Sequence, residues 1–189
     1  MAPILSVIYQ HSLDTGCVPD DWKTANVVPV FKGGEKHDPS NYRPVSLTSI
    51  VCKTLEHIVF SNIMDHLEKN SFLTNLQHGF RKQHGCETQL LTVVEDLAKG
   101  IDNRSQWDLI ILDFQKAFDK VPHSRLLKKL DYCGVKDQTH NWIKNWLTTR
   151  TQRVVVDGEQ SQLANVTSGV PQGTVLGPLM FTSMTSCWA

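Results

Sequence analysis

The stretch Trp107-Asp-Leu-Ile-Ile-Leu-Asp113-Phe-Gln-Lys-Ala-Phe-Asp119-Lys-Val-Pro-His123 has the strongest bearing on the fold. Its apolar run, Leu109 to Leu112, is rich in bulky and β-branched side chains, which favours a buried strand over residues 108–113. Asp113 follows directly, although Asp is depleted in strands and costly to bury unpaired. Because Mg²⁺ prefers hard oxygen ligands, the stretch predicts a strand that ends in a metal-binding carboxylate.

Asp119 is the second carboxylate of this stretch. It precedes Val-Pro-His, a context in which Asp commonly accepts hydrogen bonds in a turn. We therefore expect a turn or capping role for Asp119 rather than metal binding. A metal-dependent hydrolase is a more distant alternative that would need further ligands, and His123 is the only nearby candidate. Its position after Pro122 favours a helix start instead.

Composition and length describe an ordinary globular protein, with 189 residues, 40% hydrophobic and 20% charged. They allow one large domain or two small ones. The chain has no apolar run long enough for a transmembrane helix and no basic N-terminal signal region. Its five cysteines are scattered and lack CxxC spacing, so we expect reduced thiols in an intracellular protein, nuclear or cytoplasmic.

The formal net charge is zero, which argues against an autonomous nucleic-acid-binding protein of the usual basic type. Any basic surface must therefore be local. Each basic group is either a nucleic-acid contact or ordinary solvated surface. The three groups are Lys32, Lys36 and Arg43; Arg81 and Lys82; and Lys144, Arg150 and Arg153, the last within an acid-free stretch, 141–156.

Hydrophobic periodicity predicts an α+β fold with several helices and few strands. The expected helices cover residues 4–13, 49–69, 87–100, a segment capped by Ser124 that stops near Gly134, and 137–149, with a further helix beginning in 174–184. The expected strands are 25–31, placed at a sheet edge by Pro29, the extended segment 42–47, and 108–113. A hairpin over 151–166 turns at Asp157-Gly158.

Five ordered blocks resemble the reverse transcriptases of non-LTR retrotransposons, most closely the jockey-like and chicken-repeat-like groups. The blocks are Val-Pro-Asp-Asp-Trp-Lys-Thr-Ala-Asn-Val-Val-Pro-Val-Phe-Lys-Gly-Gly (18–34), Asn-Tyr-Arg-Pro-Val-Ser-Leu-Thr-Ser (41–49), Gln-His-Gly-Phe-Arg (77–81), Leu-Asp-Phe-Gln-Lys-Ala-Phe-Asp-Lys-Val-Pro-His (112–123) and Ser-Gly-Val-Pro-Gln-Gly-Thr-Val-Leu-Gly-Pro-Leu (168–179). The resemblance runs from about residue 3 to residue 181. It implies a single right-hand polymerase domain fragment, with fingers over 1–105 and a partial palm with interleaved helices over 106–189.

The resemblance implies roles for three residues of the opening stretch. Asp113 matches the first palm carboxylate, the catalytic residue that binds both Mg²⁺ ions in the family. Phe114 matches the position whose backbone carbonyl also faces the metal. Phe118 matches the bulky residue beside the sugar of the incoming nucleotide, where a ring leaves no room for a 2′-hydroxyl. Its alternative is a plain core phenylalanine.

Other nucleotide-binding candidates come from the remaining blocks. Gln172 matches a residue that touches nucleotide and template, and Gly169 and Gly173 allow close backbone approach. Arg81, Arg43 and Lys53 are candidates for the triphosphate, since guanidinium groups suit phosphate oxygens. Arg43 is alternatively a structural ion-pair residue, and Lys53 a solvated helix residue.

The activity implied is RNA-directed DNA synthesis by two-metal phosphoryl transfer. The implied partners are an RNA template, a DNA primer and deoxynucleoside triphosphates, with two Mg²⁺ ions as cofactors and no membrane. The family's aromatic-Ala-Asp-Asp hairpin is not found here, and the only Asp-Asp is Asp20-Asp21. We therefore expect an incomplete palm sheet and a truncated chain that is inactive by itself. The alternatives are a non-enzymatic nucleic-acid-binding remnant and a functionless pseudogene product.

Overall fold

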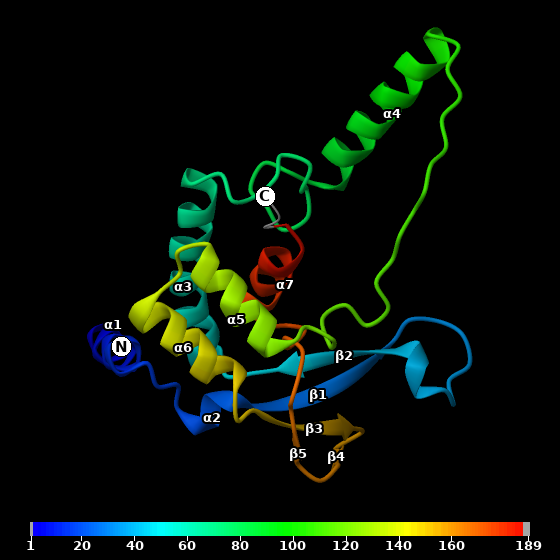
Figure 1. Ribbon diagram of the computed structural model, residues 1–189. Helices are drawn as coiled ribbons and strands as arrows, with labels where there is room; N and C mark the ends of the chain where they lie inside the picture. The colour runs from blue at the N-terminus through cyan, green and yellow to red at the C-terminus, as the bar shows by residue number, and fades with distance from the viewer. Residues whose placement is uncertain (1, 187–189) are drawn as a thin grey trace.

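A computed structural model describes residues 2–186, and Figure 1 shows most of its helices grouped on one side of a small sheet. The helices are α1 (Ala2–Thr15), α2 (Asp20–Lys23), α3 (Ile50–Lys69), α4 (Cys86–Asp102), α5 (His123–Tyr132), α6 (Asp137–Leu147) and α7 (Leu176–Ser186), with a 3₁₀ turn, η1 (Pro39–Asn41). The α+β class predicted from the sequence is confirmed. The predicted helices are confirmed within a few residues, but α5 begins at His123, so the predicted cap Ser124 is wrong and lies inside the helix.

The sheet contains parallel and antiparallel pairs. Its strands are β1 (Thr24–Phe31), β2 (Tyr42–Leu47), β3 (Thr151–Val156), β4 (Glu159–Gln160) and β5 (Ala164–Asn165), in the order β2-β1-β3-β4 with β5 also paired to β3. The prediction that β1 is an edge strand is wrong, because it lies between β2 and β3. The parallel pairing with β3 ends at Val27, so Pro29 faces a partner only in β2 and its missing N–H removes no bond to β3.

The hairpin predicted around Asp157-Gly158 is confirmed. β3 pairs antiparallel with β4, with Val156 opposite Glu159. Asp157 and Gly158 have φ values of 49° and 88°, and two positive φ values are what a type I′ turn requires. The turn residues therefore set the register of this hairpin.

The core lies where α3, α5, α6 and α7 meet. The buried apolar residues of α3 share one core cluster with the two large rings of α6, Trp142 and Trp146, which are fully buried. Leu126 and Leu130 of α5 are also fully buried, and each buried leucine contributes about 1.5–3 kcal/mol. Helices from both halves of the chain thus share one core.

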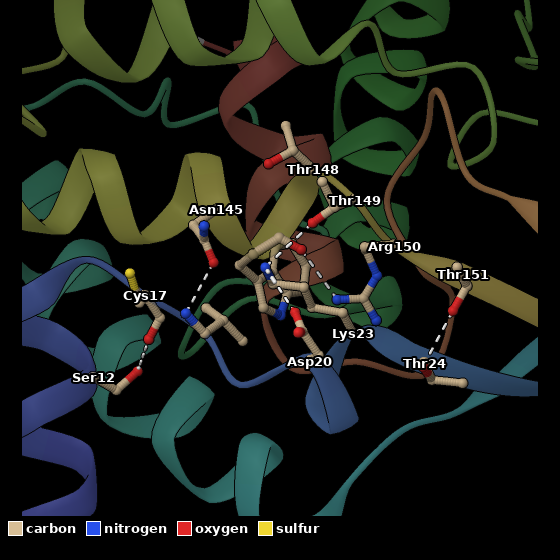
Figure 2. Close-up of polar contacts among 12 residues, drawn as sticks. Ser12, Cys17, Asp20, Lys23, Thr24, Asn145, Thr148, Thr149, Arg150 and Thr151 are labelled. Carbon is tan, nitrogen blue, oxygen red and sulfur yellow. Dashed lines mark hydrogen bonds and ion pairs between the residues drawn. The ribbon is translucent and has the colours of Figure 1, made fainter.

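Polar contacts join the segment before β1 to the segment before β3 (Figure 2). The Val18 amide donates to Asn145 Oδ1 at 2.9 Å, and Lys23 Nζ donates to Thr149 Oγ1 at 3.2 Å. Thr24 and Thr151, opposite each other at the start of the parallel pairing, share a hydroxyl hydrogen bond of 3.1 Å. These contacts align β1 and β3 from their first residues.

The strand predicted over residues 108–113 is wrong. Residues 105–114 have no regular secondary structure and none of the described strands pairs with them. Leu109, Ile110, Ile111 and Leu112 are 65–85% exposed. Figure 1 shows α4 standing away from the other helices, with this segment running back from its tip. A strand needs a neighbouring ladder, and the apolar run meets none.

Helix α4 has the amphipathic pattern predicted for it, but its apolar face is uncovered. Leu90, Leu91, Val94 and Ile101 are all more than half exposed.

Of the five cysteines, Cys17, Cys52, Cys86 and Cys133 carry free thiols, and Cys187 lies outside the described residues. Within residues 2–186 no helix has both the length and the apolar character needed to cross a membrane.

Candidate nucleotide-binding site

The loop 168–173 is fastened at its start to the segment 118–123. The Gly169 amide donates to the Val121 carbonyl at 2.9 Å, and the Val170 amide donates to the Phe118 carbonyl at 2.8 Å. His123 Nε2 lies 2.7 Å from the Gly169 carbonyl oxygen. These bonds bring together the two blocks, 112–123 and 168–179, that the sequence identified as the functional centre.

The same loop is fastened at its other end to β2. The Ser46 amide donates to the Gln172 carbonyl at 2.7 Å. Gly173 follows with a φ of +100°, and a Cβ there would lie 2.8 Å from the Ser46 carbonyl oxygen. Glycine is therefore required both by the backbone angle and by the close approach.

A cavity of about 330 Å³ opens between this loop, the segment before α5 and the sheet. It is lined by Ala25, Pro44, Ser46, Asp119, Arg150, Thr151, Gln152, Asn165, Val166, Thr167, Ser168, Gly169, Val170, Pro171 and Gln172. Hydroxyl and amide groups dominate the polar part of this wall, and they can donate or accept hydrogen bonds. Gln172, predicted to touch nucleotide and template, is one of the lining residues, and its contact with these partners stays a prediction.

Asp119 also lines this cavity. Its backbone lies in a turn, as predicted, with the Asp119 amide donating to the Lys116 carbonyl at 3.1 Å. Ser168 Oγ donates to the Asp119 carbonyl at 3.2 Å. The turn therefore places Asp119 in the wall of the same cavity as Gln172, although the sequence interpretation gave Asp119 no binding role.

Phe118 lies among aromatic rings. Its ring stacks on Phe181, with centroids 5.1 Å apart and planes at 24°. The Phe80 ring meets it edge-on at 6.4 Å and 85°. Phe80 belongs to the block 77–81 and Phe181 to α7, so the ring predicted to abut the sugar contacts rings from two other segments of the chain. The half-buried ring also packs against the core, in keeping with the core alternative.

Asp113 and Phe114 lie apart from this arrangement, on the exposed segment 105–114. Phe114 is 68% exposed. Within residues 2–186 no three His, Cys, Asp or Glu side chains gather into a group that could hold a metal ion. Because a two-metal centre needs more carboxylate oxygens than Asp113 supplies, the described residues do not fit that centre.

Arg81 is engaged by another carboxylate. Its Nε and Nη2 donate to the two oxygens of Glu68 at 2.9 and 2.7 Å, and Nη1 donates to the Thr74 carbonyl at 2.7 Å. These hydrogen bonds lower the pKa of Glu68. The guanidinium thus fastens the connector 70–81 to the end of α3 in this structure.

The other two triphosphate candidates lie on different elements. Arg43 is exposed on β2, opposite Val30 of β1. Lys53 is half-buried in the first turn of α3. Neither is among the described residues that line the cavity.

Arg150 lines the cavity, and its sequence context left it as either a nucleic-acid contact or solvated surface; the solvated alternative is wrong, because the side chain is buried. It is 2% exposed, its Nη1 donates to the Trp146 carbonyl at 3.1 Å, and its guanidinium lies 5.2 Å from the Trp146 ring centroid. Burial lowers the pKa of Arg150, and the nearby Glu56 carboxylate opposes that shift. Its place in the acid-free stretch 141–156 was the available signal, but the sequence did not indicate that the charge would be buried.

Comparison with known proteins decides the family. Residues 34–187 match the family model described as reverse transcriptase (RNA-dependent DNA polymerase). The chain belongs to the reverse transcriptase family. That match spans all the residues of the cavity wall except Ala25, and the non-LTR resemblance predicted from the sequence blocks is confirmed.

Curated relatives come from mobile elements. The chain is 34% identical over 183 residues to the RNA-directed DNA polymerase from mobile element jockey of Drosophila melanogaster, covering 96% of this chain and 20% of the relative. It is 30% identical over 189 residues to the probable RNA-directed DNA polymerase from transposon BS of Drosophila melanogaster, again covering 96% and 20%. A retrovirus-related Pol polyprotein from type-1 retrotransposable element R2 of Popillia japonica is 28% identical over 176 residues, covering 93% and 24%. This reverse transcriptase chain therefore spans about a fifth of the length of the jockey and BS relatives.

Proposed function

We propose that this chain supplies the nucleotide- and template-contacting part of an RNA-directed DNA polymerase of a non-LTR retrotransposon. Residues 1–105 would form the fingers and 106–189 part of the palm. The observation that carries the proposal is the convergence of three matched blocks, through Ser46, Phe118 and Gln172, around one polar cavity.

The proposed substrates are an RNA template, a DNA primer and deoxynucleoside triphosphates. Gln172 would contact the incoming nucleotide and the template base, because it lines the cavity, and Gly173 beside it would allow close backbone approach. Phe118 would limit space at the sugar, since Phe80 and Phe181 restrict its ring. To bind a triphosphate, Arg81 would have to release the Glu68 carboxylate. The exposed Arg43 would not need to break that ion pair.

We further propose that the chain does not polymerise by itself. The reverse transcriptase family generally uses divalent metal ions, but the described residues do not assemble a two-metal centre around Asp113. Primer extension on an RNA template with Mg²⁺ or Mn²⁺ tests this directly. We expect no extended primer, and robust incorporation of deoxynucleotides would show that the inactive interpretation is wrong.

Binding to a fluorescently labelled primer–template duplex tests the contact surface separately from catalysis. We expect binding that weakens as salt increases, because phosphate contacts release counterions. Gln172→Ala should weaken binding about 5- to 10-fold, the loss of roughly one good hydrogen-bonding contact. Gln162→Ala, at an exposed position of the hairpin, is the matched control and should bind like the parent chain.

A nucleic-acid-binding chain without catalysis is the second candidate. It is favoured by the exposed cations Lys32, Lys36 and Arg43 on the connection from β1 and on β2. Salt-dependent binding without primer extension, lost on replacing these three residues together with Gln, would support it. Absence of any binding at low salt by a folded chain would instead support the functionless product.

A further inference from the structure

Glu56 is a fully buried carboxylate on the apolar face of α3. Its Oε2 accepts hydrogen bonds from the Val175 and Leu176 amides at 2.8 and 3.2 Å. Its Oε1 accepts from Trp146 Nε1 at 3.1 Å and from Cys52 Sγ at 3.4 Å. A buried carboxylate is costly unless donors surround it, and four donors surround this one.

The donors come from three separate elements. The Val175 amide immediately precedes α7 and the Leu176 amide begins it, and at a helix start unpaired N–H groups and the helix dipole favour a negative charge. The indole belongs to α6, and the thiol lies one turn earlier on α3. Burial and the neighbouring Glu56 carboxylate raise the pKa of Cys52, so the thiol keeps the proton that it donates.

The two amides follow the loop 168–173, with only Thr174 in between. Ser46 holds the Gln172 carbonyl, and Glu56 holds the chain again at Val175 and Leu176. β2, which carries Ser46, leads into α3, which carries Glu56. The carboxyl end of the loop is therefore fixed to one continuous segment at two points, and Gly173 lies between them.

We propose that Glu56 is a positioning residue, which fixes the backbone of Gln172 and Gly173 in the orientation needed for nucleotide contact. This inference rests on the proposed function for the meaning of the contact. The fixing of the loop can be measured without any ligand. Trp146 and Cys52 bind the other carboxylate oxygen and serve to orient Glu56 itself.

Amide hydrogen exchange on the full chain tests the proposal. In Glu56→Gln, the side chain keeps its size, but its NH₂ group competes for the position facing the Val175 amide. We expect exchange of the 170–176 amides to rise at least about tenfold, while that of α5 and the first turns of α6 changes much less. When measured well below the unfolding temperature, the affinity of Glu56→Gln for a primer–template duplex should also fall about 5- to 10-fold.

Cys52→Ala is the matched control. It removes one donor to the Glu56 carboxylate but leaves the hydrogen bonds from the Val175 and Leu176 amides in place. It should leave exchange of the 170–176 amides close to that of the parent. If Glu56→Gln does not fold, Val175→Pro removes the same hydrogen bond from the other side at a position next to a helix start, where proline is tolerated. It should also raise exchange in the loop.

Two results would overturn the proposal. One is an equal rise of exchange throughout the chain, which would make Glu56 a residue of general stability. The other is unchanged exchange at 170–176 in a folded variant. If the parent chain binds no primer–template while the local rise occurs, the proposed function fails but the fixing of the loop by Glu56 stands.

Discussion

The Arg81 guanidinium and the Glu68 carboxylate form a bidentate, hydrogen-bonded ion pair, with N–O distances of 2.9 and 2.7 Å. The Arg81 side chain is 6% exposed and that of Glu68 is 38% exposed. The pair joins the Gly79-Phe80-Arg81 block to the end of α3. It therefore fixes the connector that brings Phe80 to Phe118.

The ion pair predicts a pH-dependent stability. The hydrogen bond from Arg81 lowers the pKa of Glu68 below its ordinary value of 4.5. Its contribution is therefore complete above about pH 4.5 and is lost as the pH falls through the lowered value. Because the carboxylate is partly exposed, Glu68→Gln should cost less than about 1 kcal/mol at pH 7. Chemical denaturation at pH 7 and pH 3 measures this.

The difference between parent and Glu68→Gln should be smaller at the lower pH. Glu95→Gln breaks the exposed ion pair with Lys99 and is the control, with a smaller effect expected at either pH. A difference that is the same at pH 7 and pH 3 would mean that the charge of Glu68 does not stabilise the fold.

Gly173→Ala should destabilise the chain strongly. The alanine would adopt a φ of +100° and place its Cβ 2.8 Å from the Ser46 carbonyl oxygen. We expect a loss of about 2–4 kcal/mol in the free energy of unfolding, from strain and the displaced hydrogen bond. Gly158→Ala is the control, since its φ is +88° and no atom lies within 4 Å of the added Cβ.

That control should cost only about 1 kcal/mol. Urea unfolding of both variants gives the comparison. Equal losses would indicate that the approach of the loop to β2 is looser than the structure describes.

A pair of isoleucines tests the exposed segment 105–114. Ile111 is 82% exposed and Ile143 is fully buried. Ile111→Ala should change the free energy of unfolding by less than about 0.5 kcal/mol, whereas Ile143→Ala should cost about 2–5 kcal/mol. A large loss for Ile111→Ala would restore the buried strand that the sequence predicts.

Magnesium should not stabilise this chain through Asp113. A ligand that binds only the folded state raises the unfolding temperature, so millimolar Mg²⁺ should leave that temperature unchanged in both parent and Asp113→Asn. Differential scanning fluorimetry makes the measurement. A Mg²⁺-dependent rise in the parent that Asp113→Asn abolishes would contradict this expectation.

Local patterns predicted much of the fold. The helices and the Asp157-Gly158 hairpin follow from periodicity and turn chemistry, whereas the contact between 112–123 and 168–179 is seen only in the structure. The strand predicted at 108–113 does not form. An apolar run indicates a tendency to form a strand, but it does not show whether a neighbouring strand is present to pair with it. Pro29 misled in a similar way, since its missing N–H matters only where β3 faces it.

The candidate site was predictable only in part. Gln172 lines the cavity and Gly173 follows it in the loop, and the roles of Gln172, Gly173, Phe118, Arg43 and Lys53 stay predictions. The burial of Glu56 and of Arg150 was missed, because the burial of a charged residue depends on tertiary contacts. A glutamate on the apolar stripe of α3, one turn after Cys52, was the one sequence signal for such a buried carboxylate.

The exposed segment 105–114, which follows α4, is a site at which a protease could cleave the chain. A protease would meet residues 105–114 as an extended, accessible substrate, while α3, α6 and α7 remain closed around their shared core. Cutting there would separate the chain covalently but not physically, because β1 pairs with β3 and Glu56 reaches Leu176 across the cut. The two fragments should therefore elute together in size-exclusion chromatography and separate only in denaturant. They should reassemble when the denaturant is removed.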